Sequence, residues 1–213
     1  MRGISRTYNA IAGRSIERLS AISDGLFAFA MTVIVLDIRV PTHATIHTEV
    51  QLWVAIVSLA PQFVTYLMSF LTLGIFWVAQ QTQLERMREA DRDFTWLHLL
   101  FLAAVAVLPL TTRLLAEYIT LRVALALYWA NIMLVGMILL AAFFYAHRAG
   151  LLRDDVSPEV SRAYVRRVLV AQTLYAFGAA LCFVNTFWSI GFIMLVQLNY
   201  AIAPRHRVFD WIG

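Results

Sequence analysis

The chain has 213 residues, of which 61% are hydrophobic and 14% are charged, and its mean hydropathy is +0.73. Soluble domains carry about 25% charged residues, so this composition excludes an ordinary soluble protein. A membrane-spanning helix needs about 20 apolar residues, so the chain has length for about six spans and no separate soluble domain. We therefore predict an all-α polytopic membrane protein in which residues 1–213 form a single domain.

Uncharged stretches mark the expected helices at residues 25–36, 50–83, 94–112, 123–146 and 168–203. The last stretch is too long for one span, and Asn185-Thr186 is the best place for a turn that divides it into two helices. Pro61 and Pro109 lie inside the second and third stretches, where membrane helices tolerate kinks. The turn at Asn185 brings the expected number of spans to six.

All 17 basic residues of the Lys+Arg count are arginines. With six spans, the side opposite the termini receives only Arg39, Arg113 and Arg122. The positive-inside rule then places both termini in the cytoplasm. We expect the chain to be a multi-pass protein of the cell membrane. This topology also accounts for the net charge of +4, so we expect the lipid bilayer, and not a nucleic acid, as the partner of these arginines.

The first span begins unusually, since residues 14–41 read RSIERLSAISDGLFAFAMTVIVLDIRVP. A carboxylate inside a membrane helix costs on the order of 2.5 to 3.5 kcal/mol, so Asp24 is expected to have hydroxyl, indole N–H or arginine partners on neighbouring helices. Two interpretations remain open here. Ser23, Asp24 and Gly25 either anchor the helix at the membrane surface or hold it for a functional purpose.

Helical spacing divides this span into stripes. Phe29, Val33 and Leu36 share one stripe, and Asp24 lies with Ala28 on another, well over a right angle away. We expect the Asp24 stripe to pack into protein when the Phe29 stripe faces something else. Apolar stripes are usually packing surfaces, so spacing alone leaves the role of Phe29 open.

The first span resembles the first helix of the transmembrane protein 175 family, potassium channels of lysosomes and prokaryotes, which carries a Phe-Ser-Asp-Gly-type motif. Residues 73–112, LGIFWVAQQTQLERMREADRDFTWLHLLFLAAVAVLPLTT, resemble the Tyr-Trp-x-x-His-His segment of that family and the helix after it. The sequence departs from the pattern in three respects, at four positions. Ile22 replaces the motif's Phe, Gln80 and Gln81 replace the paired histidines, and Phe29 replaces a smaller aliphatic residue.

The resemblance implies a six-helix chain that assembles as a homotetramer around a pore lined by the first helix. It also implies that the carbonyl filter of ordinary potassium channels is missing, and this sequence contains no Thr-Val-Gly-Tyr-Gly string. By the same resemblance, the pore constriction is Phe29, Val33 and Leu36, and the pore-facing threonine is Thr32. The positions expected to hold the first helix in place are Arg18, Ser23, Asp24 and Gly25 on that helix, with Trp77, Gln80 and Gln81 on the second.

Other chemistry has little support in the sequence. His43 and His47 have a metal-binding spacing but no acidic or cysteine partner, so we expect an exposed loop and no metal site. His98 stands alone near a span end and is expected to anchor at the interface. Cys182 is the single cysteine and cannot form an intrachain disulfide.

We therefore predict a potassium-preferring cation channel with a hydrophobic constriction, and not an enzyme. Monovalent cations are its expected small partners, with K⁺ the permeant species and no cofactor. Two alternatives stay open. The first is a non-conducting membrane scaffold or regulatory protein, and the second is a proton pathway that uses Asp24 as a titrating group.

Overall fold

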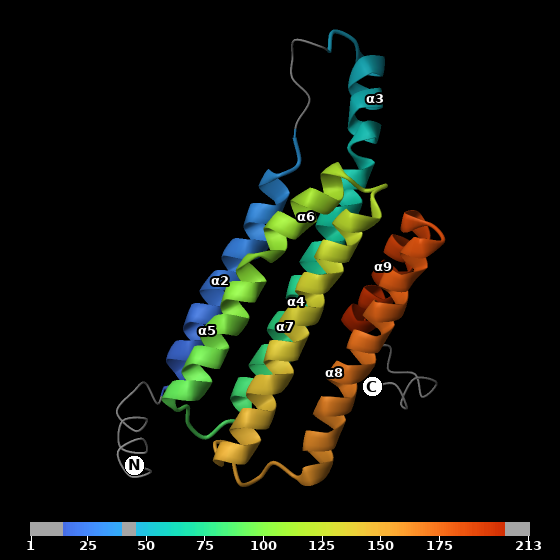
Figure 1. The fold of residues 1–213 in the computed structure, drawn as a ribbon. Coiled ribbons are helices and arrows are strands. Elements are labelled where there is room, and N and C mark those ends of the chain that lie inside the picture. The colour runs from blue at the N-terminus through green and yellow to red at the C-terminus, as the bar shows by residue number, and fades with distance from the viewer. Residues whose placement is uncertain (1–14, 40–45, 203–213) are drawn as a thin grey trace.

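The structure is a computed structural model that describes residues 15–39 and 46–202, and these are almost entirely helical (Figure 1). The helices are α2 (Ile16–Leu36), α3 (Glu49–Ser58), α4 (Ala60–Glu85), α5 (Arg92–Ala106), α6 (Leu108–Glu117), α7 (Arg122–Ala149), α8 (Pro158–Ala180) and α9 (Thr186–Ile202), with a 3-10 turn, η2 (Leu181–Phe183), between the last two.

Within the described residues, five helical segments are long and apolar enough to cross a membrane: α2, α4, α5 with α6, α7, and α8 with η2. The protein is thus an all-α polytopic membrane protein, as predicted. Helix α9 is also apolar but has 17 residues, fewer than the roughly 20 that a span needs. The sixth span therefore stays a prediction.

The two prolines inside predicted stretches mark real breaks. Helix α3 ends at Ser58 and α4 begins at Ala60, with Pro61 in its first turn. Helix α5 likewise ends at Ala106, and Pro109 lies in the first turn of α6. A proline lacks the N–H that would continue the preceding helix. As a result the stretch predicted as one helix over residues 50–83 is two, and α3 projects beyond the bundle (Figure 1).

The long last stretch folds back at the predicted place. Between α8 and α9 the Asn185 side chain accepts a hydrogen bond from the backbone N–H of Phe187 at 2.8 Å, which fixes the start of α9. The two helices then pack closely, since Ser189 Oγ donates to the carbonyl of Gly178 at 2.6 Å. A Cβ on Gly178 would lie 2.8 Å from the Ile193 side chain. Glycine there permits the close approach.

The centre of the bundle contains a buried polar network around Tyr128 of α7, which is fully buried. Its hydroxyl lies 2.9 Å from Thr72 Oγ1 and 3.3 Å from Ser69 Oγ, both on α4. Thr112 of α6 donates to Ser69 at 2.7 Å, and Gln197 of α9 donates to Thr72 at 2.7 Å. Hydrogen bonds between helices satisfy groups that the hydrocarbon cannot, so this network ties four helices together.

One end of the bundle gathers the start of α2, the loop from α4 to α5 and the loop from α7 to α8 (Figure 1). The two loops are joined by backbone hydrogen bonds, from Arg88 N to Leu151 O and from Arg153 N to Arg86 O, both 2.9 Å. Arg113, near the opposite end, lies 3.7 Å from Asp37. The described arginines therefore separate between the ends as the six-span topology requires. The arginines of both termini, and His43, lie outside the described residues.

Candidate functional site

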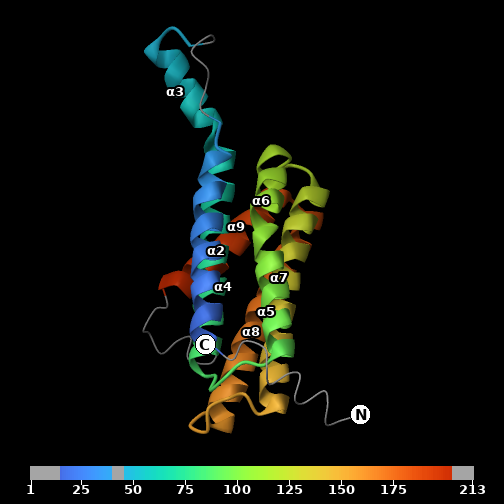
Figure 2. The ribbon, with the colours of Figure 1, turned by 90° about the vertical axis from the view of Figure 1, so that its left-hand side faces the viewer.

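Helix α2 lies on an outer face of the bundle (Figure 2) and has two contrasting sides. Its buried residues recur at helical spacing and face the neighbouring helices: Leu19, Ser23, Phe27, Ala30 and Ile34. At about 100° per residue, Phe29 points about 160° away from Phe27. The Phe29 side chain is accordingly 69% exposed, and Leu36 on the same stripe is 79% exposed.

The other two residues predicted to face the pore differ in exposure. Thr32 is exposed and Val33 is half-buried. The Thr32 hydroxyl donates to the carbonyl of Phe29 at 2.8 Å, which leaves its oxygen lone pairs directed away from the helix backbone. A single protomer therefore presents an uncovered apolar stripe with one hydroxyl in it. An exposed apolar patch in a membrane protein faces lipid or another chain.

Ser23 joins α2 to two other helices. Its side chain is completely buried, and its hydroxyl donates to the carbonyl of Leu19 at 2.7 Å. Gln80 Nε2 of α4 donates to Ser23 Oγ at 3.1 Å, and His98 Nε2 of α5 lies 2.8 Å from the same oxygen. A hydroxyl has one proton and two lone pairs. All three contacts are therefore satisfied together when His98 carries its proton on Nε2.

His98 is the site residue that sequence reasoning missed. It was expected to anchor at the interface, but it is only 3% exposed and its ring lies between those of Phe94 and Phe101, each 6.1 Å away between centroids. The expectation of an interfacial role was wrong because burial depends on which helix covers a residue, which periodicity does not reveal. The available signal was a histidine inside an otherwise uncharged stretch.

Asp24 joins α2 to α4 on the outer side of Ser23. Its Oδ1 accepts from the indole Nε1–H of Trp77 at 2.7 Å and from Gln81 Nε2 at 2.5 Å. Gln81 Oε1 in turn accepts from Ser20 at 2.9 Å. The indole N–H is one of the partner types expected for this carboxylate. Gln80 and Gln81 thus each bond one member of the Ser23-Asp24 pair.

Two expectations about this helix need correction. The stripe of Asp24 and Ala28 was expected to pack into protein, yet both residues are exposed, because the buried side of α2 centres on Phe27. Arg18 was expected to act with the motif. Its guanidinium makes no contact with Ser23 or Asp24 within the described residues, and its backbone N–H donates to Ser15 Oγ at the helix start. Gly25 is exposed, and beyond its chain neighbours and the backbone of its own helix no described atom lies within 4 Å of its Cβ position.

The sequence is similar to a group of ion channels. The family model for the endosomal/lysosomal potassium channel TMEM175 matches residues 18–109, a range that contains every predicted site residue. A potassium channel of Streptomyces collinus is 32% identical over 188 residues, covering 86% of this chain and 90% of that protein. The human endosomal/lysosomal proton channel TMEM175 is 27% identical over 192 residues, covering 88% of this chain and 37% of that protein.

The fold is also similar to a solved structure. The crystal structure of a lysosomal potassium-selective channel TMEM175 homolog from Chamaesiphon minutus matches with a TM-score of 0.75 at 26% identity. The match covers 90% of this chain and 98% of that one. The similarity therefore extends over nearly the whole helical bundle, and not over the first two helices alone.

Proposed function

The chain belongs to the TMEM175 family of ion channels, and from this premise we propose that it conducts K⁺ through a pore formed by α2 from four protomers. The family is a class of membrane channels for monovalent cations, not a class of enzymes. The proposal places the protein in the cell membrane with both termini in the cytoplasm, and K⁺ as the permeant ion with no cofactor.

The main support for the proposal is the contrast between the two sides of α2. Helix α2 is fastened to the bundle on one side through Ser23 and Asp24, while Phe29 and Leu36 on the other side are 69% and 79% exposed. A helix with a fixed orientation and an exposed apolar stripe can line the symmetry axis of an oligomer, where the same stripe from each copy faces the others. With residues at i, i+4 and i+7, four copies form three layers about one turn, or 5 to 6 Å, apart.

The constriction we propose consists of Phe29, Val33 and Leu36. An apolar ring excludes water when it is narrow and hydrates when it widens, so it gates without a charged group. Four phenylalanine rings are bulkier than four aliphatic side chains, which favours a closed resting state. Thr32 contributes a hydroxyl oxygen beside this ring, and we propose that it supplies the preference for K⁺.

Selectivity here does not use a carbonyl filter. The backbone of α2 is helical from Ile16 to Leu36, and helical carbonyls accept hydrogen bonds from the residue four positions along. Up to Thr32 these carbonyls are occupied by the hydrogen bonds of the helix, so we propose that they do not replace the water of a permeating ion. This supports a mechanism that depends on side chains.

Ion flux into liposomes containing the purified protein tests the proposal. With equal gradients of K⁺, Na⁺ and H⁺, we expect K⁺ flux to exceed Na⁺ flux. The absence of any flux from well-assembled protein would support a scaffold instead. Proton flux without K⁺ flux would favour the proton pathway. This pathway is the second candidate because Asp24 is exposed and because the human relative is a proton channel.

A further inference from the structure

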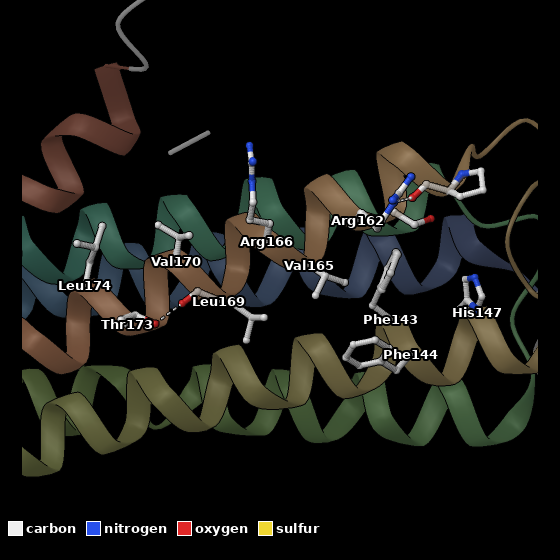
Figure 3. A pocket seen from close by; sticks show the side chains of 12 residues that line it. Phe143, Phe144, His147, Arg162, Val165, Arg166, Leu169, Val170, Thr173 and Leu174 are labelled. Carbon is white, nitrogen blue, oxygen red and sulfur yellow. Dashed lines mark hydrogen bonds between the residues drawn. The ribbon is translucent and has the colours of Figure 1, made fainter. Parts of the chain in front are cut away.

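A groove of about 680 Å³ runs between α7 and α8 (Figure 3), and none of its lining residues belongs to α2. This volume lies within the roughly 300 to 1,000 Å³ of small-molecule sites. Most of its lining is apolar, and the largest exposed contributors are Phe144, 45% exposed, and Leu169, 50% exposed. Both helices belong to candidate membrane spans, so the apolar part of the groove faces hydrocarbon.

The lining of the groove becomes basic toward the loop that joins α7 to α8. His147 of α7 and Arg162 of α8 lie at this end, with Arg166 one turn further along α8 (Figure 3). Among the described residues that line the groove, none is acidic. The Nε–H of Arg162 donates to the carbonyl of Pro158 at 3.3 Å, while a guanidinium has five N–H donors in total. Positive charge therefore accumulates at one end of an apolar channel.

The dimensions fit the geometry of a bilayer leaflet. Leu174 lies twelve residues beyond Arg162 on the same helix, which is about 18 Å at 1.5 Å per residue. One leaflet contributes about 15 Å of hydrocarbon, half of a core of about 30 Å. A molecule with its charged group at Arg162 thus has apolar surface beside it for the depth of one leaflet.

We propose that this groove binds an anionic phospholipid. Its phosphate lies against Arg162, Arg166 and His147, and an acyl chain lies along Phe144, Leu169 and Leu174. Guanidinium groups suit phosphate because their paired donors match its oxygens. Anionic lipid is also concentrated in the cytoplasmic leaflet, the side to which the positive-inside rule assigns this loop. The site is separate from the pore stripe on α2 and does not depend on ion conduction.

Native mass spectrometry of the full-length protein tests the lipid site. Protein is extracted from bilayers of equal phosphatidylglycerol and phosphatidylcholine, and the bound lipids are counted per protomer. We expect wild-type protein to retain phosphatidylglycerol preferentially, and the double variant Arg162→Gln with Arg166→Gln to retain at least tenfold less. Arg153→Gln is the matched control, because Arg153 is an exposed arginine at the same end that pairs with Asp155 at 3.5 Å. It should retain the wild-type amount.

A second variant keeps the charges and fills the groove. Thr173 is exposed and lines the apolar part, so Thr173→Phe should displace the acyl chain and lower phosphatidylglycerol retention at unchanged thermal stability. Unchanged retention in both variants would overturn the proposal, as would equal retention of phosphatidylcholine. Competition by soluble glycerol phosphate at equal strength would indicate a phosphate site without a lipid. A changed subunit number with unchanged lipid would indicate that a second copy covers the groove.

Discussion

At the residue scale, two adjacent side chains on α2 hold the helix in place through hydrogen bonds to different partners. Ser23 points inward to Gln80 and His98, and Asp24, about 100° further around the helix, points to Trp77 and Gln81. Rotation of α2 against α4 would break both sets of bonds. The rotational position of α2, and with it the direction of Phe29, is therefore set by these contacts.

Removal of the Ser23 hydroxyl should destabilise the protein markedly. Ser23→Ala leaves the buried Gln80 Nε2 and His98 Nε2 without this acceptor, and an unsatisfied buried group costs about 1 to 3 kcal/mol. Thermal unfolding in detergent measures the loss. Ser58→Ala is the control, because Ser58 is exposed and its hydroxyl donates to the carbonyl of Ala55 on its own helix at 2.6 Å. Equal effects of the two changes would refute the role given to Ser23.

Asp24 and Thr32 should differ in what they control. Asn retains an acceptor oxygen for Trp77 but loses the charge, and charge-assisted hydrogen bonds are roughly twice as strong as neutral ones. Asp24→Asn should therefore lower tetramer yield or thermal stability more than it changes the K⁺/Na⁺ permeability ratio. Thr32→Val should instead change the K⁺/Na⁺ permeability ratio more than it lowers tetramer yield or thermal stability. A stable, well-assembled Asp24→Asn protein with altered selectivity would contradict this assignment.

At the element scale, the position of α8 depends on how closely it approaches α7. The side chain of Gln172 lies so close to Gly136 that a Cβ on Gly136 would overlap its amide. Gln172 is 8% exposed and therefore has little room to move away. Glycine at position 136 thus sets the spacing of these two helices and, through it, the width of the groove between them.

Gly136→Ala should consequently destabilise the bundle by about 1 to 3 kcal/mol, the usual cost of overpacking. The matched control is Gly191→Ala, since beyond its chain neighbours and the backbone of its own helix no described atom lies within 4 Å of the Cβ position there. Alanine is also the better helix former, so the control should be neutral or slightly stabilising. A neutral Gly136→Ala in the same thermal unfolding assay would show that Gln172 moves aside easily.

The sequence predicted best those features that depend on local chemistry. Pro61 and Pro109 were expected to kink their helices, and each lies in the first turn after a helix break. Asn185 marks the turn before α9. These features follow from a missing N–H or a short polar side chain, which acts on its own neighbours. His98 and Tyr128 were not identified, because their partners lie on other helices, 59 residues away for Tyr128 and Ser69. Resemblance to the family indicated the Asp24 region, but only the structure showed that Gln81 bonds Asp24.

At the scale of the whole molecule, the bundle has two chemically different ends. The loops after α4 and α7 are hydrogen-bonded to each other, so they lie on the same side of the membrane in any topology. Arg113 and Arg122 belong to the other end. This asymmetry underlies both the predicted orientation and the lipid site.

Cysteine labelling checks that orientation. In a protein with Cys182 replaced by alanine, cysteines introduced at Arg88 and Arg153 should react only with reagent on the cytoplasmic side. A cysteine at Glu117, which is exposed at the other end, should react only from outside. Labelling of Arg88 and Arg153 from opposite sides would contradict the fold, and labelling of both from outside would reverse the topology.

The central claim is that the Phe29 stripe of α2 lines the pore, and a comparison of Phe29 with Phe27 tests it most directly. Phe27 is 1% exposed and Phe29 is 69% exposed on the same helix. K⁺ flux and thermal stability are measured for both alanine variants. Phe29→Ala should raise K⁺ flux with little loss of stability, whereas Phe27→Ala should cost about 3 to 5 kcal/mol of stability without raising flux. Unchanged flux with lost stability in Phe29→Ala would contradict the claim.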